Sequence, residues 1–404
     1  MGESRRSEGL SRETCRLPEI VTNFASLWGL DPTVEYLNHG SFGACPTAVL
    51  AEQAALRAEM EREPFDFLVG SLAMRLDAAR EELAQFLGAD AADLAFVPNA
   101  TSGVNAVLRS LELNSSDEIL VTTHTYAACR KTVDFVARRS GARVVTAALP
   151  FPCPDEDSVV EAVLRAASAR TRVALIDHVT SPTALVLPVR RLVEALAARG
   201  IDTLIDGAHA PGMVPLGLSD LGAAYYTGNA HKWLCAPKGA AFLHVRRDRQ
   251  ACVHPSVISH GYTAGFHAEF DWTGTLDPTP WLCIPAALRH IGGLLPGGWP
   301  EVMRTNHELA LRARDVLLER LAVPAPAPDG MIGSMAAIPL PRGANGAVRD
   351  TRGLHDWLRA RGVEAWLHPD PVPLVRVSAQ LYNRLDQFRH LAVLLEEALR
   401  ECRP

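Results

Sequence analysis

The chain has 404 residues, of which 48% are hydrophobic and 21% charged, and its formal net charge is −6 at pH 7. This size and composition predict a globular protein with a large buried core, divided into a large and a small domain. The net acidity gives no reason to expect a nucleic-acid or membrane partner. The one basic cluster, residues 246–249, is interrupted by Asp248, and we expect it on a solvated turn.

Eight cysteines are scattered along the chain without a C-x-x-C pair or a metal-ligand spacing. In a chain of this length, that pattern is typical of reduced thiols in a cytoplasmic protein. The first residues are polar and of mixed charge, without the apolar core of a signal peptide, and no window approaches an apolar membrane span. The sequence therefore predicts a cytoplasmic protein.

Taken in chain order, the elements begin with an arm over residues 1–35 and helical signals over 46–87. Short apolar runs then alternate with longer amphipathic segments. The expected strands are 94–97, 118–122, 143–147, 173–177, 203–206, 223–227 and 240–245, and the expected helices are 103–111, 126–140, 155–168, 188–199 and 217–222. This alternation predicts an α/β fold with a mainly parallel seven-stranded sheet covered by helices.

A helix-rich segment follows at 285–322, and residues 331–404 alternate between strand and helix. We therefore expect three parts: an N-terminal arm over 1–35, a large domain over 36–284, and a connecting helix with a small α+β domain over 285–404.

The most informative feature is the order of Asp206 and Lys232. Asp206 closes an apolar strand, where open α/β sheets bind their ligands, and Lys232 follows in the loop Gly228-Asn-Ala-His-Lys-Trp-Leu234. An enzyme that uses pyridoxal 5′-phosphate needs this pair: the lysine holds the aldehyde as a Schiff base, and the aspartate keeps the pyridine nitrogen protonated. A capping aspartate before a turn is the simpler alternative for Asp206, but its spacing to Lys232 favours function.

Further polar residues follow the other strands. Thr101 and Ser102 stand at the start of a helix, where hydroxyls and backbone N–H groups bind phosphate, although the same residues also suit an N-cap. His124 and Tyr126 are candidates for stacking on a cofactor ring. The strand-end histidines His124, His178 and His209 lack a metal-ligand spacing, so we expect cofactor hydrogen bonds rather than a metal.

Arg376 lies inside an expected strand of the small domain. A buried arginine there is typical of a bound carboxylate, because its planar fork matches one bidentately. A structural ion pair is the alternative. The early turn Tyr36-Leu-Asn-His-Gly-Ser41 is rich in hydrogen-bonding groups.

These motifs together resemble the fold-type I pyridoxal phosphate enzymes of aminotransferase class V, and among them the isopenicillin N epimerase-like group. The resemblance spans residues 34–395 and includes Asp177-His-Val-Thr-Ser-Pro-Thr183, Asp206-Gly-Ala-His209 and Arg376-Val-Ser-Ala-Gln380. It implies that Lys232 and Asp206 act as described, and that Tyr126 stacks on the ring with a catalytic role. It also implies a homodimer with its sites at the interface.

The resemblance further implies the partners of each part of the cofactor and substrate. His209 should approach the ring oxygen, and Thr101, Ser102 and His231 should hold the phosphate. Thr275 should reach the phosphate of a neighbouring subunit. Arg376, helped by Asn38, His39 or Ser41, should bind the carboxylate of an amino-acid substrate.

Three reactions remain open: epimerisation, β-elimination as in a C–S lyase, and transamination. Cysteine desulfurases of this class need a thiolate on a loop shortly before the arginine, but the chain has no cysteine between Cys283 and Cys402. We therefore expect an amino-acid epimerase, with a C–S β-lyase that lacks a cysteine nucleophile or an aminotransferase as alternatives. A second proton donor opposite Lys232 could be Tyr126 or His39. A non-catalytic binding protein is disfavoured because Lys232 and Asp206 are both present. A nicotinamide-dependent dehydrogenase is disfavoured because no G-x-G-x-x-G follows the first strand.

Overall fold

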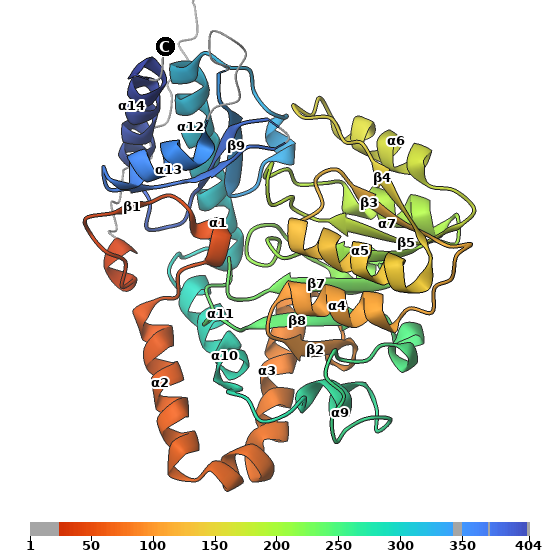
Figure 1. The fold of residues 1–404 in the computed structure, drawn as a ribbon. Helices are drawn as coiled ribbons and strands as arrows, with labels where there is room; N and C mark the ends of the chain where they lie inside the picture. The colour runs from red at the N-terminus through yellow and green to blue at the C-terminus, as the bar shows by residue number, and fades with distance from the viewer. Residues whose placement is uncertain (1–23, 342–349, 371, 402–404) are drawn as a thin grey trace, which may run out of the picture.

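The computed structural model describes residues 24–341, 350–370 and 372–401, so most of the predicted N-terminal arm lies outside the described residues. At its centre is a seven-stranded sheet with the order β2-β8-β7-β6-β5-β3-β4 (Figure 1). The strands are β2 (Leu94–Val97), β3 (Glu118–Thr122), β4 (Arg143–Ala147), β5 (Thr171–Asp177), β6 (Asp202–Asp206), β7 (Tyr225–Asn229) and β8 (Ala241–Val245). β8 is antiparallel to both its neighbours, and the remaining pairs are parallel. The predicted mainly parallel seven-stranded sheet is confirmed.

Alternate residues of the strands enter two apolar cores, one on each face of the sheet. In β5, Val173 and Leu175 belong to the core formed with α4 (Ala100–Ser110) and α5 (Ala127–Ser140). Ala174 and Ile176 belong to the core formed with α3 (Leu72–Leu87), α6 (Glu156–Ala166) and α7 (Val189–Ala197). Because helices cover both faces, polar side chains can meet a ligand only at the strand ends.

The N-terminal part forms a helical hairpin beside the sheet. α2 (Thr47–Arg62) and α3 are joined by a π-helical turn at Asp66–Ser71, and the pair projects away from the small domain (Figure 1). The shorter helices of the large domain are α1 (His39–Phe42), α8 (Leu218–Leu221), α9 (Phe266–Asp271) and α10 (Thr279–Leu282). The segment predicted as helical over 46–87 is therefore two helices.

The C-terminal part is a small α+β unit. α11 (Ile284–Gly292) and the long α12 (Gly298–Leu321) lead into an antiparallel sheet of β11 (Trp366–His368), β12 (Leu374–Ser378) and β9 (Met335–Pro339), flanked by α13 (Thr351–Arg359) and α14 (Leu385–Glu401). β10 (Val363–Glu364) pairs instead with β1 (Glu35–Tyr36), in parallel. The early segment thus docks on the small C-terminal unit.

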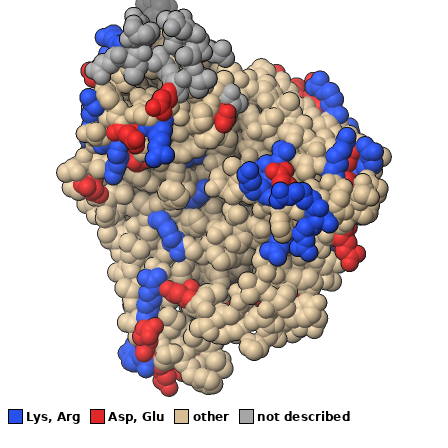
Figure 2. Space-filling view, in the orientation of Figure 1, with Lys and Arg blue, Asp and Glu red and all other residues tan. Residues whose placement is uncertain are grey.

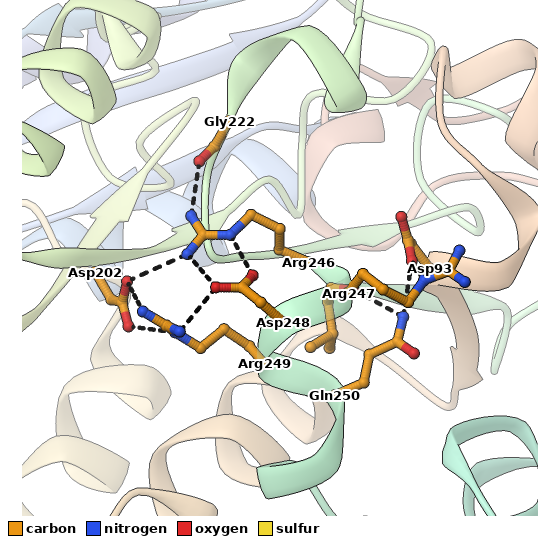
Figure 3. A network of polar contacts seen from close by, with 9 residues as sticks. Asp93, Asp202, Gly222, Arg246, Arg247, Asp248, Arg249 and Gln250 are labelled. Atoms are coloured by element: carbon orange, nitrogen blue, oxygen red, sulfur yellow. Dashed lines mark hydrogen bonds and ion pairs between the residues drawn. The ribbon is translucent and has the colours of Figure 1, made fainter.

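The basic cluster at residues 246–249 is tied to acidic partners. Arg249 binds Asp202 at 2.8 Å, Arg246 binds Asp248 at 2.6 Å, and Arg247 binds Asp93 at 2.7 Å (Figure 3). The Arg249–Asp202 pair joins the segment after β8 to the start of β6, and the Arg247–Asp93 pair joins it to the residue before β2. The cluster is a structural network.

A second concentration of positive charge lies over α5, where Figure 2 shows lysine and arginine side chains gathered. Lys131, Arg138 and Arg139 are exposed there, and Arg130 pairs with Asp134 at 3.0 Å. This patch follows the solvent side of one helix. Across the described ranges, no helix is both long and apolar enough to cross a membrane.

Candidate active site

A cavity of about 350 Å³ opens at the carboxyl ends of β5, β6 and β7. Its walls bring together many of the residues predicted from the sequence. The lining side chains that carry chemistry are Ser41, Thr101, Tyr126, Asp177, Ser181, Asp206, His209, His231 and Lys232. These residues come from segments far apart in the chain, so the fold assembles one site from separate strand ends.

Lys232 follows β7 and is the reactive amine of this cavity. Its Nζ lies 3.1 Å from His209 Nε2. Burial, with a further contribution from the nearby Arg376 cation, lowers the lysine pKa from 10.5 to about 7. A large fraction of this amine is therefore neutral near pH 7 and able to act as a nucleophile or a base.

Asp206 and Asp177 are register partners at the ends of β6 and β5. Asp206 accepts hydrogen bonds from the Cys129 thiol at 3.2 Å and the Ala208 N–H at 3.0 Å. Asp177 accepts the Tyr126 N–H at 3.3 Å, while its Oδ2 is buried without a partner among the described residues. Burial raises the pKa of both carboxyls, and repulsion from Asp206 raises that of Asp177 further.

The start of α4 is prepared to bind an anion. Asn99 caps the helix by accepting the Ser102 N–H at 2.9 Å, and Asn229 Oδ1 accepts the Ala100 N–H at 2.8 Å. Thr101 lines the cavity at this helix N-terminus, where the helix dipole favours a phosphate. The Ser102 hydroxyl donates to the Oδ1 of the capping residue Asn99 at 3.1 Å, and its contact with a phosphate stays a prediction.

His231 directly precedes Lys232 in the chain and also lines the cavity. Its Nδ1 is 3.0 Å from the Ala240 carbonyl, which leaves Nε2 as the second polar atom of the ring. Burial lowers its pKa to about 4, so the ring is neutral at pH 7. The loop is tightly packed: Gly43 has φ +72°, and a Cβ there would lie 2.1 Å from the His231 carbonyl oxygen.

Arg376, in β12, is a buried cation beside the cavity. Its guanidinium donates to the Ser181 carbonyl at 2.6 Å and the Ser41 hydroxyl at 2.8 Å, and it stacks 4.3 Å from the Trp366 ring centroid. Burial lowers its pKa to about 10. Among the described residues its hydrogen-bond partners are Ser181, Asn38 and Ser41, none of them a carboxylate, and its Nε is unpartnered. The structural ion pair considered above is thus not observed, and the free charge fits a ligand carboxylate.

The three early residues predicted to bind substrate, Asn38, His39 and Ser41, occupy different positions relative to the cavity. Ser41 lines the cavity, and Asn38 Oδ1 lies 3.4 Å from Arg376 Nη2. His39 instead lies fully buried behind the lysine loop, with Nδ1 2.9 Å from the Tyr382 hydroxyl and Nε2 3.0 Å from the Lys232 carbonyl. His39 is not one of the residues that line the cavity. Both of its ring nitrogens instead contact groups that hold the lysine loop.

Tyr126 and Thr275 differ in their relation to the cavity. Tyr126 lines it and is 42% exposed, and burial is the main cause that raises its phenol pKa. Thr275 is exposed and lies outside the lining, so its contact with a neighbouring subunit remains a prediction.

Two cavity residues were not assigned a role from the sequence. Asp177 ends a strand in the same way as Asp206, which is the signal that could have identified it. Ser181 was visible only as part of a motif, because its carbonyl contact with Arg376 depends on tertiary packing. Across the described ranges no group of three or more His, Cys, Asp or Glu side chains could hold a metal ion.

Comparison with known proteins places this site in a family. The family model for aminotransferase class-V matches residues 55–294. The chain belongs to the aminotransferase class-V family. An isopenicillin N epimerase from Amycolatopsis lactamdurans is 39% identical, with 91% of this chain and 96% of that protein covered. A putative L-cysteine desulfhydrase from Oryza sativa subsp. japonica is 33% identical, with 76% of this chain and 67% of that protein covered.

Solved structures support the same fold. A cystine C–S lyase in complex with cysteine persulfide superposes with a TM-score of 0.76 at 20% identity, covering 90% of this chain and 97% of that chain. The chain therefore has the fold-type I architecture of pyridoxal phosphate enzymes, as its motifs predicted.

The cofactor of this class-V enzyme is pyridoxal 5′-phosphate, and the cavity residues fit it. Lys232 would provide the amine, Asp206 a buried carboxylate for the pyridine nitrogen, Thr101 and His231 the phosphate contacts, and Tyr126 an aromatic ring, since all five line the cavity. Two buried polar atoms of the wall, Asp177 Oδ2 and His209 Nδ1, have no partner within the described part of the chain. Unsatisfied buried groups of this kind are expected where a polar cofactor binds.

Proposed function

We propose that the protein is an epimerase that inverts the Cα configuration of an amino acid with a substituted or peptide-like side chain. The observation that supports an amino-acid substrate is the buried Arg376 guanidinium, which lies beside the Lys232 cavity without a carboxylate partner among the described residues. Inversion is supported by the 39% identity to an isopenicillin N epimerase over nearly the whole chain.

When bound, the cofactor supplies an electron sink that makes the Cα–H bond of the substrate acidic. The chain's own groups then decide the outcome. Arg376 and Ser41 hold the substrate carboxylate, and Asp206 holds a proton at the pyridine nitrogen. Lys232 takes the Cα proton, since burial lowers its pKa to about 7, close to the value that suits a general base at neutral pH.

The second proton donor is assigned to Tyr126. Burial raises the pKa of its phenol, so the hydroxyl stays protonated at neutral pH and can return a proton to Cα. His39, the other candidate, has both ring nitrogens engaged by Tyr382 and the Lys232 carbonyl. That arrangement supports a positioning role for His39.

A C–S β-lyase is the second candidate, and the 33% identity to a putative L-cysteine desulfhydrase favours it. Such an enzyme would release its sulfur product directly. The Cys129 thiol donates to Asp206 at 3.2 Å, and burial raises its pKa well above the usual value of a thiol. It is therefore a neutral hydrogen-bond donor and a poor persulfide-forming nucleophile.

The proposal is tested by following the reaction to equilibrium from each of the two enantiomers. Separate incubations of the holoenzyme start from the L- and the D-enantiomer of each substrate in a panel, and chiral chromatography follows the products. An epimerase brings both incubations to the same mixture of enantiomers with the side chain intact. Accumulation of a 2-oxo acid with loss of the side-chain sulfur would replace the first proposal by the second.

A further inference from the structure

A second cavity, of about 360 Å³, lies next to the active site on the other side of Phe42. Phe42 lines both cavities and is 70% exposed, so it presents apolar surface to a ligand in either of them. Large exposed apolar groups beside a functional site commonly mark a ligand-binding surface.

This second cavity is built by the pairing of β1 with β10. Tyr36 is the register partner of Glu364, and the backbone of Glu35 donates to the Gly362 carbonyl at 2.8 Å. The pairing brings Leu30 and Val34, which precede β1, against Arg359 at the end of α13. The cavity therefore belongs to the folded framework that carries the substrate arginine.

Asn38 connects the cavity to the proposed carboxylate anchor. It lines the second cavity, its Oδ1 accepts the Ser41 hydroxyl at 2.6 Å and lies 3.4 Å from Arg376 Nη2, and its Nδ2 donates to Glu364 at 3.2 Å. The Asn38 side chain thus lies between the second cavity and a substrate carboxylate held at Arg376.

The walls of the second cavity favour an uncharged ligand. Leu30, Val34, Tyr36 and Phe42 supply apolar surface. The charged residues at the rim are already engaged: Asp31 accepts from the Thr33 N–H and hydroxyl at 2.9 and 2.7 Å.

Glu364 lies 3.6 Å from Arg359 and 3.4 Å from His355. Its carboxylate is thus balanced by neighbouring donors. A ligand in this cavity would gain from apolar contact, and both lining carboxylates already accept hydrogen bonds, Asp31 from Thr33 and Glu364 from Asn38.

We propose that this cavity is a subsite for the substrate side chain and takes an extended aliphatic or aromatic substituent, such as the S-substituent of a cysteine thioether. The inference rests on the proposed role of Arg376 as carboxylate anchor. Burial of each further methylene is worth about fourfold in binding or in kcat/KM, which corresponds to about 0.8 kcal/mol.

The experiment uses the holoenzyme and a series of S-alkyl-L-cysteines from S-methyl to S-hexyl. Loss of the Cα–H bond in heavy water, counted in all products and in remaining substrate, gives kcat/KM whichever reaction follows. Dissociation constants come from the change in the cofactor's visible absorption on ligand binding. Both quantities are expected to improve about fourfold per methylene over the first members of the series.

Val34→Trp would fill the cavity and flatten this chain-length dependence, and Phe42→Ala, at an exposed position that tolerates truncation, would weaken it. Val393→Trp, on α14 and 36% exposed, is the matched control and keeps the slope. Equal affinity across the series, or an unchanged slope in Val34→Trp, would overturn the subsite. If affinity and kcat/KM improved with chain length only for S-carboxyalkyl cysteines, the proposal that the subsite takes an apolar substituent would be overturned.

The two proposals fail in different ways. If no substrate loses its Cα–H bond, the proposed reaction fails, and the dissociation constants still decide whether chain length matters. If Cα–H loss occurs at the same efficiency for every chain length, the labilisation of Cα stands and the subsite fails, and the identity of the products decides separately between epimerisation and β-elimination.

Discussion

Asp177 and Asp206 are register partners on neighbouring strands, and both carboxyl groups enter the wall of the same cavity. Two buried carboxylates at such a position cannot both ionise without strong repulsion, so the pair retains a proton that isolated aspartates would have lost. Asp206 has donors in Cys129 and Ala208, whereas Asp177 Oδ2 lacks a partner within the described residues. We therefore assign the retained proton to Asp177.

The first prediction concerns the pH dependence of stability. Because the folded-state pKa of Asp177 lies well above its unfolded value of 3.8, the folded protein binds more protons than the unfolded chain above that pH. This contribution is fully present below pH 3.8 and is lost as pH rises through the folded pKa, by about 1.4 kcal/mol per pH unit for one proton.

Asp177→Asn should remove this loss, so the free energy of unfolding of the variant should fall less steeply with pH above 4. Urea unfolding of cofactor-free protein at a series of pH values measures the slope. Asp157→Asn, at a side chain that is 73% exposed, is the control. Identical slopes for wild type and Asp177→Asn would place the proton elsewhere.

The second prediction concerns Lys232. Lys232→Ala should lose both covalent attachment of the cofactor and the proton-transferring amine, and its activity should fall by at least about 10⁴-fold. Borohydride reduction followed by mass spectrometry measures the attachment, and Lys131→Ala on the outer side of α5 is the control. A cofactor still fixed to Lys232→Ala would mean that another amine forms the bond.

The third prediction separates binding from chemistry at Arg376. Arg376→Lys keeps the charge but loses the planar fork that contacts a carboxylate bidentately, so KM should rise about 100-fold, the equivalent of about 3 kcal/mol, while kcat changes little. Steady-state kinetics with a carboxylate substrate measures both. Arg384→Lys, whose partner is Asp386 at the surface, should leave KM unchanged. A fall in kcat at constant KM would argue against the anchor role.

The fourth prediction concerns His39, whose ring bridges the Tyr382 hydroxyl and the Lys232 carbonyl. His39→Leu removes the partner of the buried Tyr382 hydroxyl, whereas the Lys232 carbonyl still accepts the Cys235 N–H at 3.1 Å, so the change should cost about 1–3 kcal/mol of stability. Urea unfolding measures this loss, with His390→Leu at a 46% exposed position as control. Wild-type stability combined with a large rise in KM would instead support direct substrate binding by His39.

Much of the sheet was predictable because its strands are short apolar runs separated by amphipathic helices. β2, β3 and β4 have the predicted bounds, whereas α4 begins at Ala100 instead of residue 103 because Asn99 caps it through the Ser102 N–H. The sequence order of Asp206 and Lys232 predicted a shared site because it matches the chemistry of the cofactor, and both residues line one cavity.

Other features depend on contacts between distant segments and left little local signal. The position of His39 behind the lysine loop is set by Tyr382, far along the chain. The unpaired state of Arg376 and the second cavity beside Phe42 likewise arise only when the small C-terminal unit meets the early segment. A sequence pattern could suggest these residues but could not show which way each side chain faces.

The most direct measurement of the central claim is deuterium incorporation with chiral analysis. The holoenzyme acts in heavy water on L-amino acids and cysteine thioethers, and mass spectrometry and chiral chromatography examine each product. An epimerase yields an intact substrate that carries one deuterium at Cα and has the D configuration. A 2-oxo acid formed with loss of the side-chain substituent, and without any D-enantiomer, would contradict the proposed epimerisation.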